Sequence, residues 1–171
     1  MVKYNFDQVH STLEFSIKHL MVSKVKGSFD NYNVDVTGDF NDLSTVQATV
    51  TIDVDSINTG NKDRDNHLKS ADFFNTDEHN QIVFKSTKIT ENSVTGDLTI
   101  AGVTHEETFD FDFNGVSANP LTGGKVTGFS VSGKINREKY GVNFNQALET
   151  GGVMIGKEVK FEADGEFSIE E

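Results

Sequence analysis

The stretch "TVQATVTIDVDSI", residues 45–57, contains the clearest strand pattern in this chain. Every second residue is apolar, at Val46, Ala48, Val50, Ile52 and Val54, and each residue between them is polar or charged. Successive side chains of a strand point to opposite faces, so the pattern predicts a strand with one apolar and one polar face. The apolar face needs partners, which the rest of the chain must supply.

The same alternation recurs along the chain, at residues 11–20, 25–40, 81–90, 92–103, 105–116, 125–136 and 158–171. A phase slip near Asp30 and Asn31 predicts a bulge. Turn signals such as "NPLTGG" separate the strands and predict sequential antiparallel hairpins, because tight turns cannot join parallel neighbours. With about eight strands and no long helix to cover an apolar face, the sequence predicts an all-β, antiparallel eight-stranded barrel with one or two short helices at its rim.

Composition narrows the classes of function. We expect residues 1–171 to form one domain, since this length suits one compact core. The chain has 15 Lys and Arg against 27 Asp and Glu, a formal net charge of −12, which disfavours nucleic acid and binding of membranes through basic patches. It has no cysteine. No signal peptide or apolar span is visible, so we expect a cytoplasmic protein without stable membrane insertion.

Residues 61–75 and 137–156 interrupt the alternation, and each segment carries one of the two arginines, Arg64 or Arg137. If "DRDNHL" formed a strand, Asp63, Asp65 and His67 would share a side and could bind a metal. If it forms a helix, the aspartates lie at the N-terminus, where they cap amides and stabilise the helix dipole. A helix of this kind is stable without a ligand, and no other motif is visible that could supply a third metal ligand. We therefore expect no metal site.

Signals for catalysis are weak. Ser11 and His10 are neighbours on a strand and point to opposite faces, and the chain has no G-x-S-x-G, P-loop or G-x-G-x-x-G motif. We therefore expect no catalytic residue and no cofactor. One enzymatic hypothesis stays open, in which His67 and either Asp63 or Asp65 act as an acid–base pair on an amphipathic substrate.

The interior of an eight-stranded barrel is either filled by side chains or wide enough for a small ligand. Glycines within the strands, at Gly96, Gly128, Gly133 and Gly165, mark bends or places of close approach. The residue pattern alone leaves the filled barrel, acting as a binding platform, and the hollow barrel equally open.

Four stretches resemble the YceI-like family of lipid-binding proteins, in the same order along nearly the whole chain: "DQVHSTLEFSIKHLMVSKVKGSF", "SINTGNKDRDNHLKSADFFNTDEHNQIVFKST", "VTGDLTIAGVTHEET" and "NREKYGV". The resemblance implies an extended, lipocalin-like barrel that holds a long isoprenoid chain, such as a polyprenyl or quinone tail, without catalysis. This chain departs from the family at His79, where a proline is usual, and in lacking the export signal that many members carry.

The resemblance makes the inward residues the lining of a lipid pocket, and by phase these are Leu13, Phe15, Ile17, His19, Val50, Ile52, Phe84, Leu98, Ile100, Phe111, Phe129 and Val131. It also suggests a headgroup site at the mouth, formed by Arg64, His67, Arg137 and Tyr140. The alternative is that the arginines pair with Asp63, Asp65, Asp72 or Glu138 and only fasten the rim. The expected partner is an isoprenoid or another long amphipathic lipid, and a homodimer that covers the mouth is compatible with this arrangement.

Overall fold

The computed structural model describes residues 3–20, 22–70, 73–142 and 155–170. Their secondary structure is almost entirely β. The strands are β1 (Lys3–His19), β2 (Ser23–Phe29), β3 (Tyr32–Asp39), β4 (Asp42–Asp53), β5 (Ile57–Asn58), β6 (Gln81–Ile89), β7 (Ser93–Ile100), β8 (Val103–Ala118), β9 (Lys125–Asn136) and β10 (Ile155–Glu170). Three short helices lie between them: η1 (Val54–Ser56), α1 (Lys62–Lys69) and η2 (Arg137–Tyr140), of which η1 and η2 are 3-10 helices.

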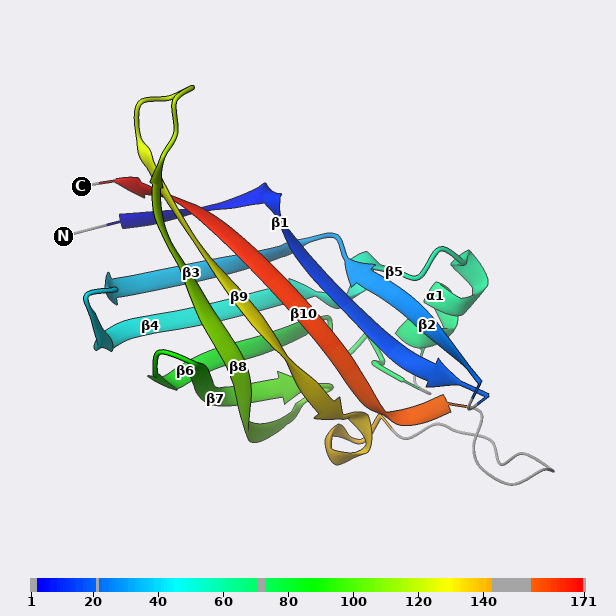
Figure 1. Ribbon diagram of the computed structural model, residues 1–171. Helices are drawn as coiled ribbons and strands as arrows, with labels where there is room; N and C mark the ends of the chain where they lie inside the picture. Colours follow the sequence, from blue (N-terminus) through cyan, green and yellow to red (C-terminus); the bar gives the residue numbers. More distant parts are fainter. Residues whose placement is uncertain (1–2, 21, 71–72, 143–154, 171) are drawn as a thin grey trace.

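All described strands belong to one antiparallel sheet in the order β3-β4-β6-β7-β8-β9-β10-β1-β2-β5. The sheet curls round so that the first half of β1 faces β3 (Figure 1). There the Phe6 and Tyr32 rings lie 5.5 Å apart, and the Tyr4 and Phe40 rings 5.2 Å apart. The predicted all-β antiparallel barrel is confirmed, and side-chain packing joins β1 to β3.

The described residues form ten strands, where the sequence predicted eight. The predicted strand over residues 25–40 is two strands, because the chain turns between β2 and β3. Asp30 N donates to Ser56 O at 3.2 Å and Asp53 N donates to Asn31 O at 3.0 Å, so this corner is bonded to the chain around η1 instead of continuing the ladder. The second strand beyond the predicted eight is the short β5, which pairs with β2 over two residues only.

The two ends of the barrel differ, because the helices lie at one end and long hairpins lie at the other. The β1–β2 turn, α1 and η2 lie at one end, on the right of Figure 1, and we call this the mouth end. The start of β1, the end of β10, and the β3–β4 and β8–β9 hairpins lie towards the other end. Among the described residues, no helix is both long and apolar enough to cross a membrane.

Candidate functional site

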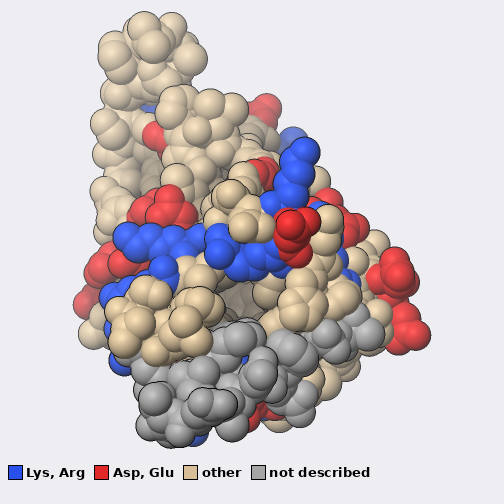
Figure 2. Space-filling model, turned by 90° about the vertical axis from the view of Figure 1, so that its right-hand side faces the viewer, with Lys and Arg blue, Asp and Glu red and all other residues tan. Residues whose placement is uncertain are grey.

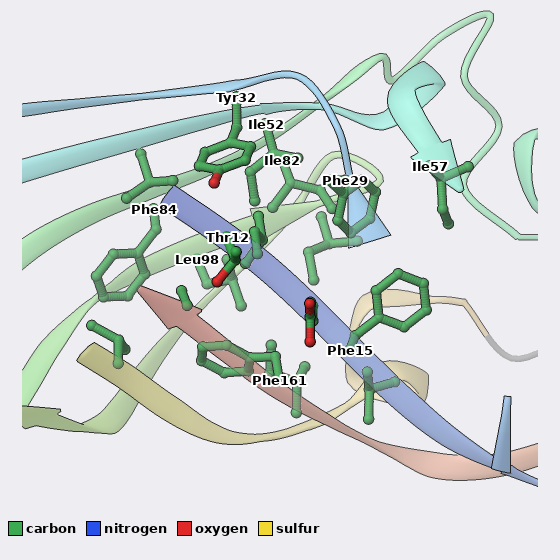
Figure 3. A pocket seen from close by; sticks show the side chains of 18 of the residues that line it. Thr12, Phe15, Phe29, Tyr32, Ile52, Ile57, Ile82, Phe84, Leu98 and Phe161 are labelled. Atoms are coloured by element: carbon green, nitrogen blue, oxygen red, sulfur yellow. The ribbon is translucent and has the colours of Figure 1, made fainter. Parts of the chain in front are cut away.

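A cavity of about 690 Å³ lies inside the barrel, and every described strand contributes side chains to its wall. The alternation of the strands turns one face inward, and that face is apolar. Figure 3 shows Phe15, Phe29, Phe84 and Phe161 projecting from different strands around the same space. The volume falls within the range of about 300–1,000 Å³ that is typical of small-molecule sites. The barrel is therefore hollow, and its interior suits an apolar ligand.

The structure places all twelve predicted pocket residues on the cavity wall: Leu13, Phe15, Ile17, His19, Val50, Ile52, Phe84, Leu98, Ile100, Phe111, Phe129 and Val131. That they contact a ligand stays a prediction. The prediction left out other residues that also line the wall, among them Tyr32, Val46, Phe109, Phe161, Ala163 and Phe167. These six share the phase of their strands' inward set, so the same alternation identifies them.

Aromatic rings pack together towards the end of the cavity that lies away from the mouth. Phe40 stacks on Phe113 at 5.1 Å between ring centroids and lies 4.7 Å from Phe129, which in turn is 5.1 Å from Phe167. Such ring pairs stabilise packing beyond their buried area by about 0.5–1.5 kcal/mol each. This cluster gives that end of the cavity an aromatic wall.

Two of the strand glycines make room for rings of the wall. A Cβ on Gly133 would lie 2.6 Å from Cδ1 of Phe109, and one on Gly96 would lie 2.7 Å from Cζ of Phe84 and 2.3 Å from Lys85 O. A side chain at either position would force the phenylalanine or the neighbouring strand to move. These glycines permit close approach, as their position suggested, but the approaching groups belong to the protein itself.

At the mouth end the cavity wall includes Arg64, and the first turn of α1 holds this side chain in place. Asn61 caps the helix by accepting a hydrogen bond from Arg64 N at 3.0 Å. Arg64 Nε donates to Thr59 Oγ1 at 2.8 Å, and Nη2 donates to Thr59 O at 2.6 Å. Asp65 accepts from Thr59 N and Oγ1, at 3.0 and 2.6 Å. The arginine and the aspartate therefore fasten the β5–α1 connection together.

The expected roles of the aspartates are corrected in one respect. The capping side chain is Asn61, because the cap must precede the first helical residue and have extended backbone, and Asn61 has φ −143° and ψ 114°. Asp63 and Asp65 do lie in the first turn, where their charges stabilise the helix dipole. Among the described residues, Arg64 makes no ion pair, and its Nη1 makes no hydrogen bond. Asp72 lies outside the described residues.

Arg137 occupies a different environment, although it also lines the cavity. Its side chain is 6% exposed, and burial lowers the pKa of its guanidinium while the charge of Glu138 opposes that shift. Nε donates to Gly156 O at 2.9 Å and Nη1 donates to Val142 O at 2.7 Å. Arg137 thus fastens the chain after η2 to the start of β10 through backbone carbonyls.

The other two predicted mouth residues differ from each other. His67 is exposed on the cavity wall, and its ring packs edge-on against Phe73 at 5.0 Å. Tyr140 lies in η2 at the mouth end, but it is completely buried and is not part of the cavity wall. It ends η2, and its ring packs edge-on against His105 at 5.1 Å. Burial raises the pKa of Tyr140, and the charge of Glu107 adds to the shift.

Tyr32 is a polar residue of the cavity that the prediction missed as a site residue. Its ring lines the wall, and its hydroxyl is buried and has no hydrogen-bond partner among the described residues. Figure 3 shows this hydroxyl directed into the cavity. Burial raises the pKa of Tyr32, and the charge of Asp164 adds to the rise. The Tyr32 hydroxyl can therefore donate a hydrogen bond to an oxygen atom of a ligand in the cavity.

The helix at the mouth does not assemble metal ligands. Within the described residues, three groups of the metal-binding type come within 4.8 Å of one another at Asp7, His10 and Glu166, and not at Asp63, Asp65 and His67. His10 Nδ1 lies 2.7 Å from Asp7 Oδ2 and 3.3 Å from Glu166 Oε2. These three residues pair with one another where the β1–β10 register shifts, and all three are at least partly exposed.

The fold and the cavity together define the class of this protein: an antiparallel barrel that encloses an apolar cavity with a polar, partly basic mouth. The model of the YceI-like domain family matches residues 4–167, and the chain belongs to this family. A UPF0312 protein of Staphylococcus aureus (strain bovine RF122) is 67% identical over 171 residues, and the alignment covers both chains completely. A UPF0312 protein of Staphylococcus epidermidis is 64% identical over 170 residues, 99% of each chain.

Solved structures share this architecture. A YceI protein of Campylobacter jejuni has a TM-score of 0.73 and 31% identity, over 91% of each chain. Burkholderia cenocepacia BcnA has a TM-score of 0.79 and 23% identity, over 95% of this chain and 99% of the other. A polyisoprenoid-binding domain from Saccharophagus degradans has a TM-score of 0.68 and 14% identity, over 98% and 99%. At these identities the last two comparisons support the fold alone.

Proposed function

We propose that this protein binds a long-chain isoprenoid lipid, with a polyprenyl or quinone-like chain, and stores or transports it in the barrel without altering it chemically. The observation that carries the proposal is the continuous apolar cavity, to which all ten described strands contribute. Membership of the YceI-like family supports it, and a solved domain with the same barrel fold is described as polyisoprenoid-binding.

The apolar tail supplies most of the binding free energy. Burial contributes about 0.8 kcal/mol per CH₂, so an isoprene unit of about five carbons contributes up to about 4 kcal/mol. The wall offers this tail few polar groups, of which the Tyr32 hydroxyl is one. Affinity therefore depends on how many units fit inside.

Arg64 is the residue that we assign to the headgroup. It lies on the cavity wall at the mouth, and its Nη1 makes no hydrogen bond to a described residue. An arginine fork suits a phosphate oxygen, and a hydrogen bond to a charged group is worth about 1.5–3 kcal/mol. We assign Arg137 to fastening the chain, since two backbone carbonyls occupy its guanidinium.

The test begins with the protein purified from its own host, extracted with organic solvent and examined by mass spectrometry. We expect an isoprenoid lipid in an amount close to that of the protein. Delipidated protein should then bind polyprenyl phosphate, and Arg64→Ala should weaken that binding by at least about tenfold while leaving binding of the neutral polyprenol unchanged. Protein that is empty on isolation and binds neither compound would refute the proposal.

The cytoplasmic location and the homodimer expected from the sequence stay predictions.

A further inference from the structure

Basic side chains gather at the mouth end of the barrel, although the protein as a whole is strongly acidic. Figure 2 looks onto this end and shows lysine and arginine side chains crossing it beside a recess. The β1–β2 hairpin, which lies at this end, carries three exposed lysines, Lys18, Lys24 and Lys26. Lys160 on β10 and Lys134 on β9 continue the group across the neighbouring strands.

Strand pairing places several of these lysines opposite one another. Lys18 faces Lys24 directly across the β1–β2 ladder, and Lys160 faces Lys134 across β9–β10. Like charges in directly opposed positions destabilise a sheet. Lys134 has an ion pair with Glu158 at 3.4 Å, but Lys18, Lys24 and Lys26 have none with any described residue. In a chain with 27 acidic residues, this arrangement leaves the hairpin with positive charge for an external anion.

On the β1–β2 hairpin the acidic residues lie farther from the mouth: β2 has none, and on β1 the nearest is Glu14, which faces Glu162. On β10, Glu158 lies on the mouth side of Lys160, where its charge is paired with Lys134. Glu14 and Lys18 are separated by roughly 13 Å of strand at about 3.3 Å per residue. The Debye length at physiological salt is about 8 Å, so Glu14 offsets the field of Lys18 and Lys24 only weakly. The β1–β2 hairpin is therefore locally positive, although the net charge of the whole chain is −12.

The turn between these basic strands is apolar. Val22 is 86% exposed and Leu20 is 40% exposed. Leu20 also has φ 53°, a left-handed backbone conformation that a leucine side chain rarely adopts. An apolar tip flanked by lysines has the composition of a surface that anchors in the interfacial region of an anionic bilayer.

We propose that the mouth end docks on anionic lipid bilayers, with Lys24 and Lys26 beside the headgroup phosphates and Val22 entering the interface. Docking in this way sets the cavity mouth against the bilayer. A lipid then passes between membrane and barrel without crossing water; this last point rests on the proposed function, whereas the docking surface does not.

The experiment measures flotation of the protein with vesicles of phosphatidylcholine, with and without phosphatidylglycerol. We expect binding to the anionic vesicles only, and its loss at high salt. Lys24→Glu combined with Lys26→Glu should lower the partition coefficient by at least about 30-fold, given about 1 kcal/mol for each basic residue at the surface. The matched control, Lys85→Glu with Lys88→Glu, makes the same charge change at exposed positions of β6 and should bind somewhat more weakly at most.

A second pair of variants tests the apolar tip. Val22→Ser should weaken binding severalfold, while Leu121→Ser, at a 93% exposed leucine in the β8–β9 turn, should not. Three outcomes would each overturn the docking proposal. The two double-lysine variants bind anionic vesicles equally well, the wild type binds neutral and anionic vesicles equally well, or the wild type binds neither. Lipid extracted from the same samples separates the two proposals. Intact loading without docking refutes docking alone, and docking without any loading refutes the proposed function.

Discussion

Replacing Ala163 by phenylalanine gives a direct test of the proposal that the cavity holds the ligand. Ala163 lies on the cavity wall in β10, between Leu13 of β1 and Val131 of β9. A phenylalanine there extends into empty space and removes no existing contact. Its ring adds about six carbons, slightly more than an isoprene unit, which would otherwise contribute up to about 4 kcal/mol.

We therefore expect Ala163→Phe to weaken isoprenoid binding by up to about three orders of magnitude. In the ligand-free protein, filling the cavity should leave the free energy of unfolding unchanged or raise it by about 1 kcal/mol. The two effects have opposite signs, which distinguishes a blocked cavity from a damaged fold. Displacement of an apolar fluorophore measures the affinity with little background, because the chain has no tryptophan, and urea unfolding measures the stability.

The matched control is Glu162→Phe, which places the same side chain on the exposed face of the same strand. It also relieves the opposition of Glu162 to Glu14. This variant should bind lipid with wild-type affinity. If Ala163→Phe also retains wild-type affinity in a folded protein, the ligand does not occupy this cavity and the reasoning fails.

Three further predictions concern stability. Tyr32→Phe removes a buried hydroxyl without a described partner and should raise the free energy of unfolding of the ligand-free protein by about 1 kcal/mol in urea; a loss of that size would contradict the structure. Arg137→Ala leaves the carbonyls of Val142 and Gly156 without their donors and should lower the free energy of unfolding by about 3 kcal/mol. Arg64→Ala, at a half-buried residue, should lower it by about 1 kcal/mol. Equal losses for the two variants in urea unfolding would refute the distinction between the arginines. Burial raises the pKa of all three tyrosines, Tyr4, Tyr32 and Tyr140. The tyrosines of the unfolded chain therefore lose their protons at a lower pH than those of the folded chain, so the free energy of unfolding should decline above about pH 10. Urea unfolding across this pH range measures the decline, and Tyr140→Phe should make it shallower.

The sequence identified most of the wall of the cavity because strand phase is a local property. Alternation over a few residues determines which side chains share a face, and an apolar face must turn away from water. The twelve predicted residues therefore lie together, although they come from six strands. The same local signal underestimated the strand count, since the corner between β2 and β3 depends on bonds to residues about 25 positions away.

The roles of the polar residues depended on contacts that no local pattern contains. Arg64 bonds to Thr59 and Arg137 to carbonyls at Val142 and Gly156, and only the folded chain decides which partner each guanidinium meets. The orientation of Tyr140 likewise follows from the 3-10 turn that buries it.

The sequence by itself determined an antiparallel barrel with an apolar inner face, because the period of two in hydrophobicity sets strand faces residue by residue. The tertiary structure decided that this interior is hollow, since the volume left inside depends on how all the strands pack around it. It also decided that lysines distant in the chain, such as Lys18 and Lys160, gather at one end of an acidic protein. Net charge is a sum over residues, whereas a surface field depends on which charges the register of the strands brings together.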